Sequence, residues 1–376
     1  MLDTTDPNYL IIETARRFAQ EKLLPTAAAR EQSGVIEPEI IAALGEMGFL
    51  GATLSSDYGG SEIPYEAYAQ VVEEIAAGDG SVSTLVSVHN APTCEILEKF
   101  ASPEQKERWL RPLATGEAVG SFALTEPSAG SDASGVKTRA VRTNSGYVIN
   151  GAKQFISNAR IGKTTVLFAV TDPEKGKKGI SAFIVANDTP GFSVARVEHK
   201  LGQKASDSCA LSFDDMQVPD EQRIGAEGDG LKIALSTLES GRIGIAAQSV
   251  GMARAALDYA IQYAKERKQF GRPIIEHQAV GFRLVEAKTK LAAARELTLR
   301  AARLKDAGQP ALEAAAMAKL FASEIAEQVC SAAIQTLGGY GYLADYPVER
   351  IYRDVRVCQI YEGTSDVQKI ILQRML

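Results

Sequence analysis

The order of local patterns along the chain constrains the fold more than any other feature of the sequence. Apolar residues recur at helical spacing over the first 118 or so residues, as in segments 11–24, 38–48 and 65–77. Short runs rich in β-branched and aromatic residues follow up to about residue 218, and the helical period then returns. Because helices and strands are segregated rather than alternating, a doubly wound nucleotide-binding sheet does not fit.

The middle segment is predicted to form a small all-β sheet or barrel. Its runs are separated by turns rich in Gly, Pro, Asp or Lys, and Asn144-Ser145-Gly146 between two runs is a hairpin signal. The predicted strands are 122–124, 140–149, 164–170, 180–185, 192–197 and 210–213.

The C-terminal segment is predicted to be a helical bundle. One apolar stripe runs from Ile243 to Ala264 and another from Val280 to Ala301. A third helix is expected from Pro310 to Gly338-Gly339, because Pro favours helix starts and Gly favours helix ends. A shorter fourth helix is expected from Ser365 to Leu376.

These patterns predict a mainly α protein with a central β domain (α+β). Its expected parts are an N-terminal helical domain (1–118), a middle β-barrel-like domain (119–228) and a C-terminal four-helix bundle (229–376). A length of 376 residues allows two to three domains, and 45% hydrophobic residues with a net charge of −6 are typical of a soluble globular protein. No run approaches the roughly 18 apolar residues of a membrane span, and the first residues do not resemble a signal peptide, so a cytoplasmic location is expected.

The spacing of cysteine and histidine argues against a metal site or a disulfide framework. The cysteines lie far apart without a CxxC pair, and we interpret them as small apolar core residues. The histidines sit singly, without an HExxH pattern or an i, i+4 partner, so no metal site is expected. These residues are Cys94, Cys209, Cys330, Cys358, His89, His199 and His277.

Two segments of the middle part contain side chains suited to a planar ring or a phosphate. In the loop 124–132, glycine and small hydroxyl residues let backbone N–H groups approach a ligand, and Thr125 and Ser131 add hydrogen-bond groups. In the strand 151–159, Phe155 and Ser157 are two apart and share a face. The alternatives are an ordinary surface loop and a half-buried strand with an inward Phe.

Two segments of the C-terminal part suit the nucleotide portion of a cofactor. Residues 266–273 hold three cations at a helix end, and arginine is suited to bidentate pyrophosphate recognition, although such cations also complement the helix dipole. Residues 335–342 form a glycine-rich turn in which backbone could approach a nucleotide. This turn is not a dinucleotide fingerprint, because no strand precedes it.

The segment 360–366 places Glu362 between an aromatic residue and a flexible glycine, just ahead of the final predicted helix. A carboxylate in an apolar, water-poor site has a raised pKa and can act as a general base. The alternative is a capping charge near a helix start.

Taken together and in this order, the segments resemble the acyl-CoA dehydrogenase family over nearly the whole chain. The matching motifs are FALTEPSAGSD (122–132), GAKQFISNA (151–159), LESGRIGIAAQSVG (238–251), ERKQFGRP (266–273), QTLGGYGY (335–342) and YEGTSD (361–366). SGRIGIA and KLGQKASDS are most similar to the short-chain and short-branched-chain members. Phe155 stands where Trp is frequent in the family and Ser157 where Thr is frequent, and both keep the chemical type.

The resemblance implies an FAD cofactor between the middle domain and the C-terminal bundle, shared between the subunits of a homotetramer built as a dimer of dimers. The residues expected at the ring and the phosphates are Leu124, Thr125, Phe155, Ser157 and Ser131. The residues expected to hold the ADP portion, bound mainly to the neighbouring chain, are Arg267, Gln269, Phe270, Gln335, Gly338 and Gly339. Thr364 and Asp366 are expected to complete the nucleotide site.

The resemblance also implies the reaction. Glu362 is expected to remove the proton α to the thioester while the β-hydride passes to flavin N5, giving a trans-2-enoyl-CoA. Some relatives carry the base at the position matching Gly241, where glycine cannot serve. The residues expected at the substrate are Ser131, Arg242, Tyr361 and Gly363. Arg242 could reach the CoA moiety or brace the Glu362 loop, and an arginine at a helix N-terminus paired with Glu239 is the alternative.

The expected substrate is a short or short-branched acyl-CoA, and the expected electron acceptor is an electron-transferring flavoprotein. An acyl-CoA oxidase that uses dioxygen is the nearest alternative, but such oxidases are usually much longer. A flavin-binding relative that binds nucleic acid is a second alternative. The net charge of −6 and the intact Glu362 motif argue against it, so no nucleic-acid partner is expected.

Overall fold

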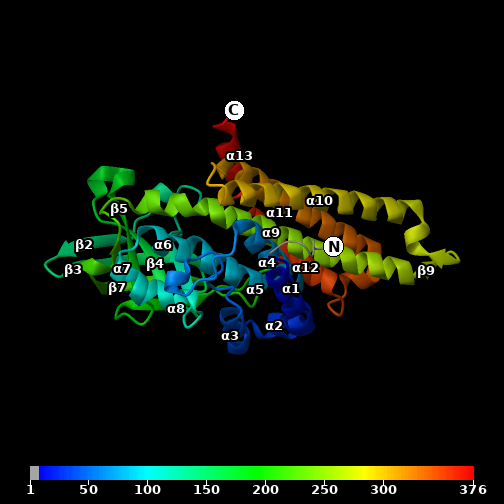
Figure 1. Ribbon diagram of the computed structural model, residues 1–376, viewed down its shortest axis with the longest axis horizontal. Helices are drawn as coiled ribbons and strands as arrows, with labels where there is room; N and C mark the ends of the chain where they lie inside the picture. Colours follow the sequence, from blue (N-terminus) through cyan, green and yellow to red (C-terminus); the bar gives the residue numbers. More distant parts are fainter. Residues whose placement is uncertain (1–7) are drawn as a thin grey trace.

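One long helix organises the fold of residues 8–376, the part of the chain that the computed structural model describes. Helix α9 (Gly230–Glu266) has 37 residues. It runs from the sheet at one end of the molecule to the small hairpin of β9 (Lys268–Gln269) and β10 (Arg272–Pro273) at the other (Figure 1). Helices from both ends of the sequence pack along it, among them α4 (Tyr65–Gly78), α10 (Gln278–Asp306) and α11 (Leu312–Leu337).

The central sheet has eight strands in the order β6-β7-β3-β2-β4-β5-β8, with β1 beside β4. Strand β4 pairs in parallel with β1 and β2, and the other pairs are antiparallel. The predicted hairpin is present, because Thr143 pairs with Gly146 across Asn144-Ser145. The strands are β1 (Gly120–Ala123), β2 (Arg139–Thr143), β3 (Gly146–Ser157), β4 (Thr164–Val170), β5 (Ile180–Ala186), β6 (Phe192–Val197), β7 (Ser208–Pro219) and β8 (Arg223–Ile224).

Helices flank the sheet in sequence, so the predicted fold class, mainly α with a central β domain, is confirmed. The N-terminal helices include α1 (Tyr9–Phe18), α2 (Ala27–Ser33), α3 (Pro38–Glu46) and α5 (Gly80–Val88). The third C-terminal helix begins at Leu312 rather than Pro310, and the last helix is α13 (Ser365–Gln373). Helix α12 (Pro347–Val355) was not predicted, because its buried face includes Asp354 and its buried apolar residues are few: Val348, Ile351 and Val355.

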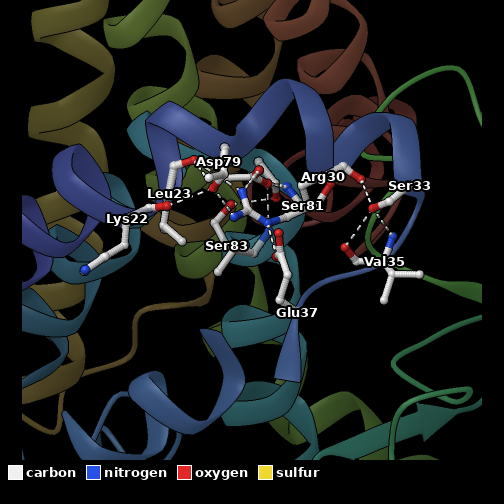
Figure 2. A network of polar contacts seen from close by, with 12 residues as sticks. Lys22, Leu23, Arg30, Ser33, Val35, Glu37, Asp79, Ser81 and Ser83 are labelled. Carbon is white, nitrogen blue, oxygen red and sulfur yellow. Dashed lines mark hydrogen bonds and ion pairs between the residues drawn. The ribbon is translucent and has the colours of Figure 1, made fainter. Parts of the chain in front are cut away.

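A buried arginine joins the N-terminal helices (Figure 2). Arg30 of α2 is 1% exposed. Its guanidinium donates to Asp79 Oδ2 at 2.7 Å and to Glu37 Oε2 at 2.7 Å. Asp79 in turn accepts hydrogen bonds from the backbone N–H groups of Ser81 and Val82 and so caps α5. The Arg30–Asp79 ion pair therefore connects α2 to the start of α5.

The four cysteines are buried and free, in agreement with their interpretation as small core residues. Within residues 8–376, no group of three or more His, Cys, Asp or Glu side chains could hold a metal ion. In the same part of the chain, no helix is both long enough and apolar enough to cross a membrane.

Candidate functional site

The segment before α13 has an uncommon backbone conformation. Glu362 has a φ of 54° and Gly363 a φ of 87°, so two consecutive residues are left-handed. This conformation is readily accessible to glycine, but for a non-glycine residue such as Glu362 it costs about 1–3 kcal/mol and persists only where neighbouring groups hold it.

The Glu362 carboxylate lies against Gly241 of α9. A Cβ built on Gly241 would lie 2.7 Å from Glu362 Oε2, so only glycine leaves room for the carboxylate there. Glu362 Oε2 is inaccessible to solvent and has no partner within residues 8–376. Burial raises the pKa of Glu362 to about 7, although the positive charges of Arg242 and Lys319 act to lower it. The carboxylate can therefore exchange a proton near neutral pH.

Arg242 lies three turns inside α9 and is 5% exposed. It is therefore not an arginine at a helix N-terminus. Its Nε has no partner in the described part of the chain, and burial lowers its pKa against the opposing influence of Glu362 and Glu239. The structure thus places a buried cation beside the Glu362 carboxylate.

Three helices hold the backbone around Glu362. Lys319 Nζ, from α11, donates to the Gly363 carbonyl at 2.6 Å. Gln368 Nε2, from α13, donates to the carbonyls of Gly363 at 2.8 Å and Glu362 at 3.2 Å. Thr364 caps α13, and the Tyr361 hydroxyl donates to Gln248 of α9. The carboxylate therefore sits on a loop that is fixed on several sides.

A second group of predicted residues gathers at the end of β3. Lys153 Nζ donates to the Leu124 carbonyl at 3.0 Å, and the Gln154 N–H donates to the Thr125 carbonyl at 2.8 Å. The register between β3 and β7 shifts after Lys153, which is a bulge, and Phe155 has a φ of 59°. Phe155 is consequently 63% exposed, while Ser157 is half-buried on the same strand. An exposed aromatic face beside a polar loop can receive a planar ring.

A third group lines an open groove of about 560 Å³ at the far end of α9. Its wall includes Arg267, Gln269, Gly338, Gly339 and Tyr340. A Cβ at either glycine would meet no atom within 4 Å, so the backbone there is open to a ligand. The Arg267 guanidinium lies 5.8 Å from the centroid of the Tyr340 ring, above its face. A groove with a cation, an aromatic ring and open backbone suits a nucleotide.

One chain does not bring these groups together. Arg267 follows Gly241 by about 26 residues along α9, which is roughly 39 Å of helix. The hairpin end is also remote from the sheet in Figure 1. Four predicted residues are exposed and belong to none of the three groups: Ser131, Phe270, Asp366 and Gln335, the last of which is not part of the groove wall. Thr364 lies with the Glu362 group.

Three buried polar residues next to these groups were not predicted. Lys319 and Gln368 hold the Glu362 loop, and Lys153 supports the loop at Leu124 while also pairing with Glu126 at 2.8 Å. A signal existed for Lys319, because it falls on the alanine-rich buried stripe of α11, where a charged residue needs a specific reason.

Comparisons with known proteins agree with this architecture. Family models match residues 5–117 (acyl-CoA dehydrogenase, N-terminal domain), 121–216 (middle domain) and 228–376 (C-terminal domain). The short-chain specific acyl-CoA dehydrogenase of Clostridium acetobutylicum is 43% identical over 363 residues, which is 96% of each chain.

Solved structures are similarly close. Butyryl-CoA dehydrogenase from Megasphaera elsdenii superposes with a TM-score of 0.97 at 41% identity, over 100% of this chain and 99% of that one. A chain from work on the electron-transferring flavoprotein of Acidaminococcus fermentans gives the same TM-score at 43% identity, with the same coverage. Members of the matched family are FAD-dependent oxidoreductases that act on CH–CH bonds. The chain therefore belongs to the acyl-CoA dehydrogenase family, as its six motifs predicted.

Proposed function

We propose that this protein oxidises a short or short-branched acyl-CoA to the trans-2-enoyl-CoA, with Glu362 as the base. The observation that carries the proposal is the Glu362 carboxylate itself. It lies over Gly241, its buried Oε2 has no hydrogen-bond partner among the described residues, and burial raises its pKa to about 7. The short-chain and butyryl-CoA specificities of the two relatives support the substrate class.

The residues of the Glu362 loop have complementary tasks in this reaction. The carboxylate accepts the proton from the carbon α to the thioester. The Glu362 N–H, which has no acceptor in the described part of the chain, donates to the thioester carbonyl, where negative charge develops. Tyr361 and Gly363, the residues before and after Glu362, contact the substrate. Arg242 acts on Glu362 through its buried charge, which favours the ionised form of the carboxylate.

FAD fits the residues present. When bound, it supplies the hydride acceptor at N5. Leu124, Thr125, Phe155 and Ser157 would hold its ring, and Ser131 a phosphate. The ADP portion would lie in the groove of Arg267 with Gln269, Phe270, Gln335, Gly338 and Gly339, and Thr364 and Asp366 would complete the nucleotide site. Because ring residues and groove lie far apart in one chain, the groove would serve the FAD of a neighbouring chain in a homotetramer.

Arg267→Ala should weaken FAD binding about tenfold to a hundredfold, because a charge-assisted hydrogen bond to the pyrophosphate is lost. The dissociation constant is measured by titrating FAD into the apoprotein. Lys268→Ala is the matched control, since Lys268 is the next cation along the chain but does not line the groove. Equal weakening in both variants would contradict a specific role for Arg267.

The proposed electron acceptor is an electron-transferring flavoprotein. The structure of high similarity from work on such a flavoprotein supports this choice. Dioxygen is the alternative acceptor, in which case the protein is an oxidase. Stopped-flow reoxidation of the substrate-reduced protein separates the two, because rapid reoxidation by air-saturated buffer alone would reject the dehydrogenase.

The proposed function is tested by anaerobic visible spectra of the purified holoprotein before and after adding butyryl-CoA. Bleaching of the flavin band is the expected result, and 2-methylbutyryl-CoA and octanoyl-CoA then rank the chain lengths. A higher specificity constant for octanoyl-CoA than for both shorter substrates would reject the short-chain assignment. A flavin that no acyl-CoA bleaches would reject the proposed reaction.

A further inference from the structure

We infer that Lys319 is a positioning residue for the proposed base: through the Gly363 carbonyl it holds the left-handed turn that keeps the Glu362 carboxylate over Gly241. This inference rests on the proposed function of Glu362. Lys319 belongs to α11, 44 residues before Gly363 in the sequence, and none of the six family motifs includes it.

The burial of Lys319 is the first observation. The residue is 0% exposed and lies among buried alanines of α11, including Ala315, Ala318 and Ala322. A buried ammonium loses its hydration, so it is retained where it makes a specific interaction. Its ammonium forms no ion pair within 4 Å in residues 8–376, and its hydrogen bond goes to the Gly363 carbonyl at 2.6 Å.

The backbone that Lys319 holds is the second observation. Glu362 and Gly363 both have positive φ, and for a non-glycine residue this conformation persists only where surrounding groups hold it. Gln368 Nε2 donates to both carbonyls, whereas Lys319 donates to that of Gly363, and a Cβ on Gly363 would lie 2.8 Å from Gln368 Nε2. The two donors therefore fix the orientation of both peptide groups, and with it the direction of the Glu362 side chain and N–H.

The charge of Lys319 also acts on the carboxylate. The charged groups that face Glu362 are Arg242 of α9 and Lys319 of α11, and both lower its pKa against the effect of burial. Lys319 itself faces Cys358, Glu324 and Arg242, and burial lowers its pKa to about 8. Removing this cation should raise the pKa of Glu362, so the base would need a higher pH to ionise.

The test compares Lys319→Met, Lys319→Arg and the control Lys200→Met in the holoprotein. Lys200 Nζ also donates to a backbone carbonyl, that of Ser206 at 2.7 Å, but it is not among the groups that act on Glu362. In Lys319→Met, kcat with butyryl-CoA should fall about 100-fold, the loss that follows from a misplaced reacting group. KM and FAD content should stay near wild type.

Two further readouts separate positioning from general destabilisation. The acid limb of the pH profile of kcat should move to higher pH in Lys319→Met and stay in place in Lys319→Arg, because arginine keeps the positive charge. Lys319→Arg should still have a lower kcat than wild type, because its donor atoms lie elsewhere. Hydrogen–deuterium exchange of residues 360–366 should speed up in Lys319→Met and not in Lys200→Met. These readouts do not follow from a loss of folded protein alone.

A wild-type kcat in Lys319→Met overturns the inference, and if that variant does not fold, a wild-type kcat in Lys319→Arg does so. Failure of the proposed function looks different, because it is seen in the wild-type protein as a flavin that butyryl-CoA does not bleach. Bleaching in wild type together with identical behaviour of Lys319→Met and Lys200→Met would leave the proposed function intact and reject the role of Lys319.

Discussion

Glu362→Gln should retain FAD but lose flavin reduction by butyryl-CoA by about 10⁴-fold, the upper range for removal of a general base. The amide has the shape of the carboxylate but cannot accept the α-proton. The rate is measured by anaerobic stopped flow at the flavin band. The matched control is Glu324→Gln on α11, which neutralises a carboxylate that is not among the groups acting on Glu362. Unchanged reduction in Glu362→Gln would place the base elsewhere.

The pH dependence of the wild-type reaction identifies the same group. Because the pKa of Glu362 in the ligand-free protein is raised to about 7, kcat/KM should fall as pH drops through 7, where the base becomes protonated. Asp354 is also buried, with a pKa raised to about 7. Asp354→Asn is therefore the control variant, and it should keep the acid limb. Loss of the acid limb in Asp354→Asn would show that the limb reports Asp354 and not Glu362.

The stability of Glu362→Gln gives an independent check on the burial of the carboxylate. The folded pKa lies above the ordinary value of 4.5, so the folded protein binds more protons than the unfolded chain between these values. The contribution of Glu362 to wild-type stability should therefore decrease as pH rises from about 4.5 to 7. Glutamine does not ionise, so the Glu362→Gln variant lacks this decrease in stability. Above pH 7 the variant should therefore have an unfolding temperature no lower than that of wild type.

The fold could be predicted where local signals suffice. Strands 164–170 and 192–197 have the predicted ends, because turn residues on both sides mark where each apolar run stops. Helix α12 was missed, since its buried face includes the charged Asp354 beside only three apolar residues. The bulge at Phe155 was also missed, because it depends on pairing with β7, which lies about 50 residues later in the sequence.

The candidate site could be predicted in part, for a related reason. The YEGTSD motif identified Glu362 through the family resemblance, but a left-handed glutamate cannot be read from sequence, where Gly and Asn are the usual residues with positive φ. Lys319 was missed because its partner is 44 residues away and periodicity treats a charged residue as solvent-facing. Local sequence patterns predict which segments contain the reactive residues. Which buried side chains hold those segments in place depends on tertiary packing, which local patterns do not encode.

Arg30→Met should lower the free energy of unfolding of the α2–α5 region by about 3–5 kcal/mol, the usual effect of removing one partner from a buried ion pair. The change leaves the Asp79 carboxylate, which is 9% exposed, without the guanidinium that pairs with it at 2.7 Å. The measurement is native-state hydrogen exchange of the α5 amides, which reports the free energy of opening. Arg17→Met on the exposed face of α1 is the matched control.

A double variant separates charge from packing in this network. Arg30→Met with Asp79→Asn removes both charges and keeps a cap for α5, so it should be more stable than Arg30→Met alone. Equal exchange in Arg30→Met and Arg17→Met would show that the pair contributes nothing measurable. Helix α5 is also connected to the loop of the proposed base. Thr84 of α5 forms hydrogen bonds with Gln203 and Gln248, and Gln248 accepts the hydrogen bond of the Tyr361 hydroxyl. Loosening α5 should therefore lower kcat at temperatures where α5 begins to open, and leave kcat unchanged below them.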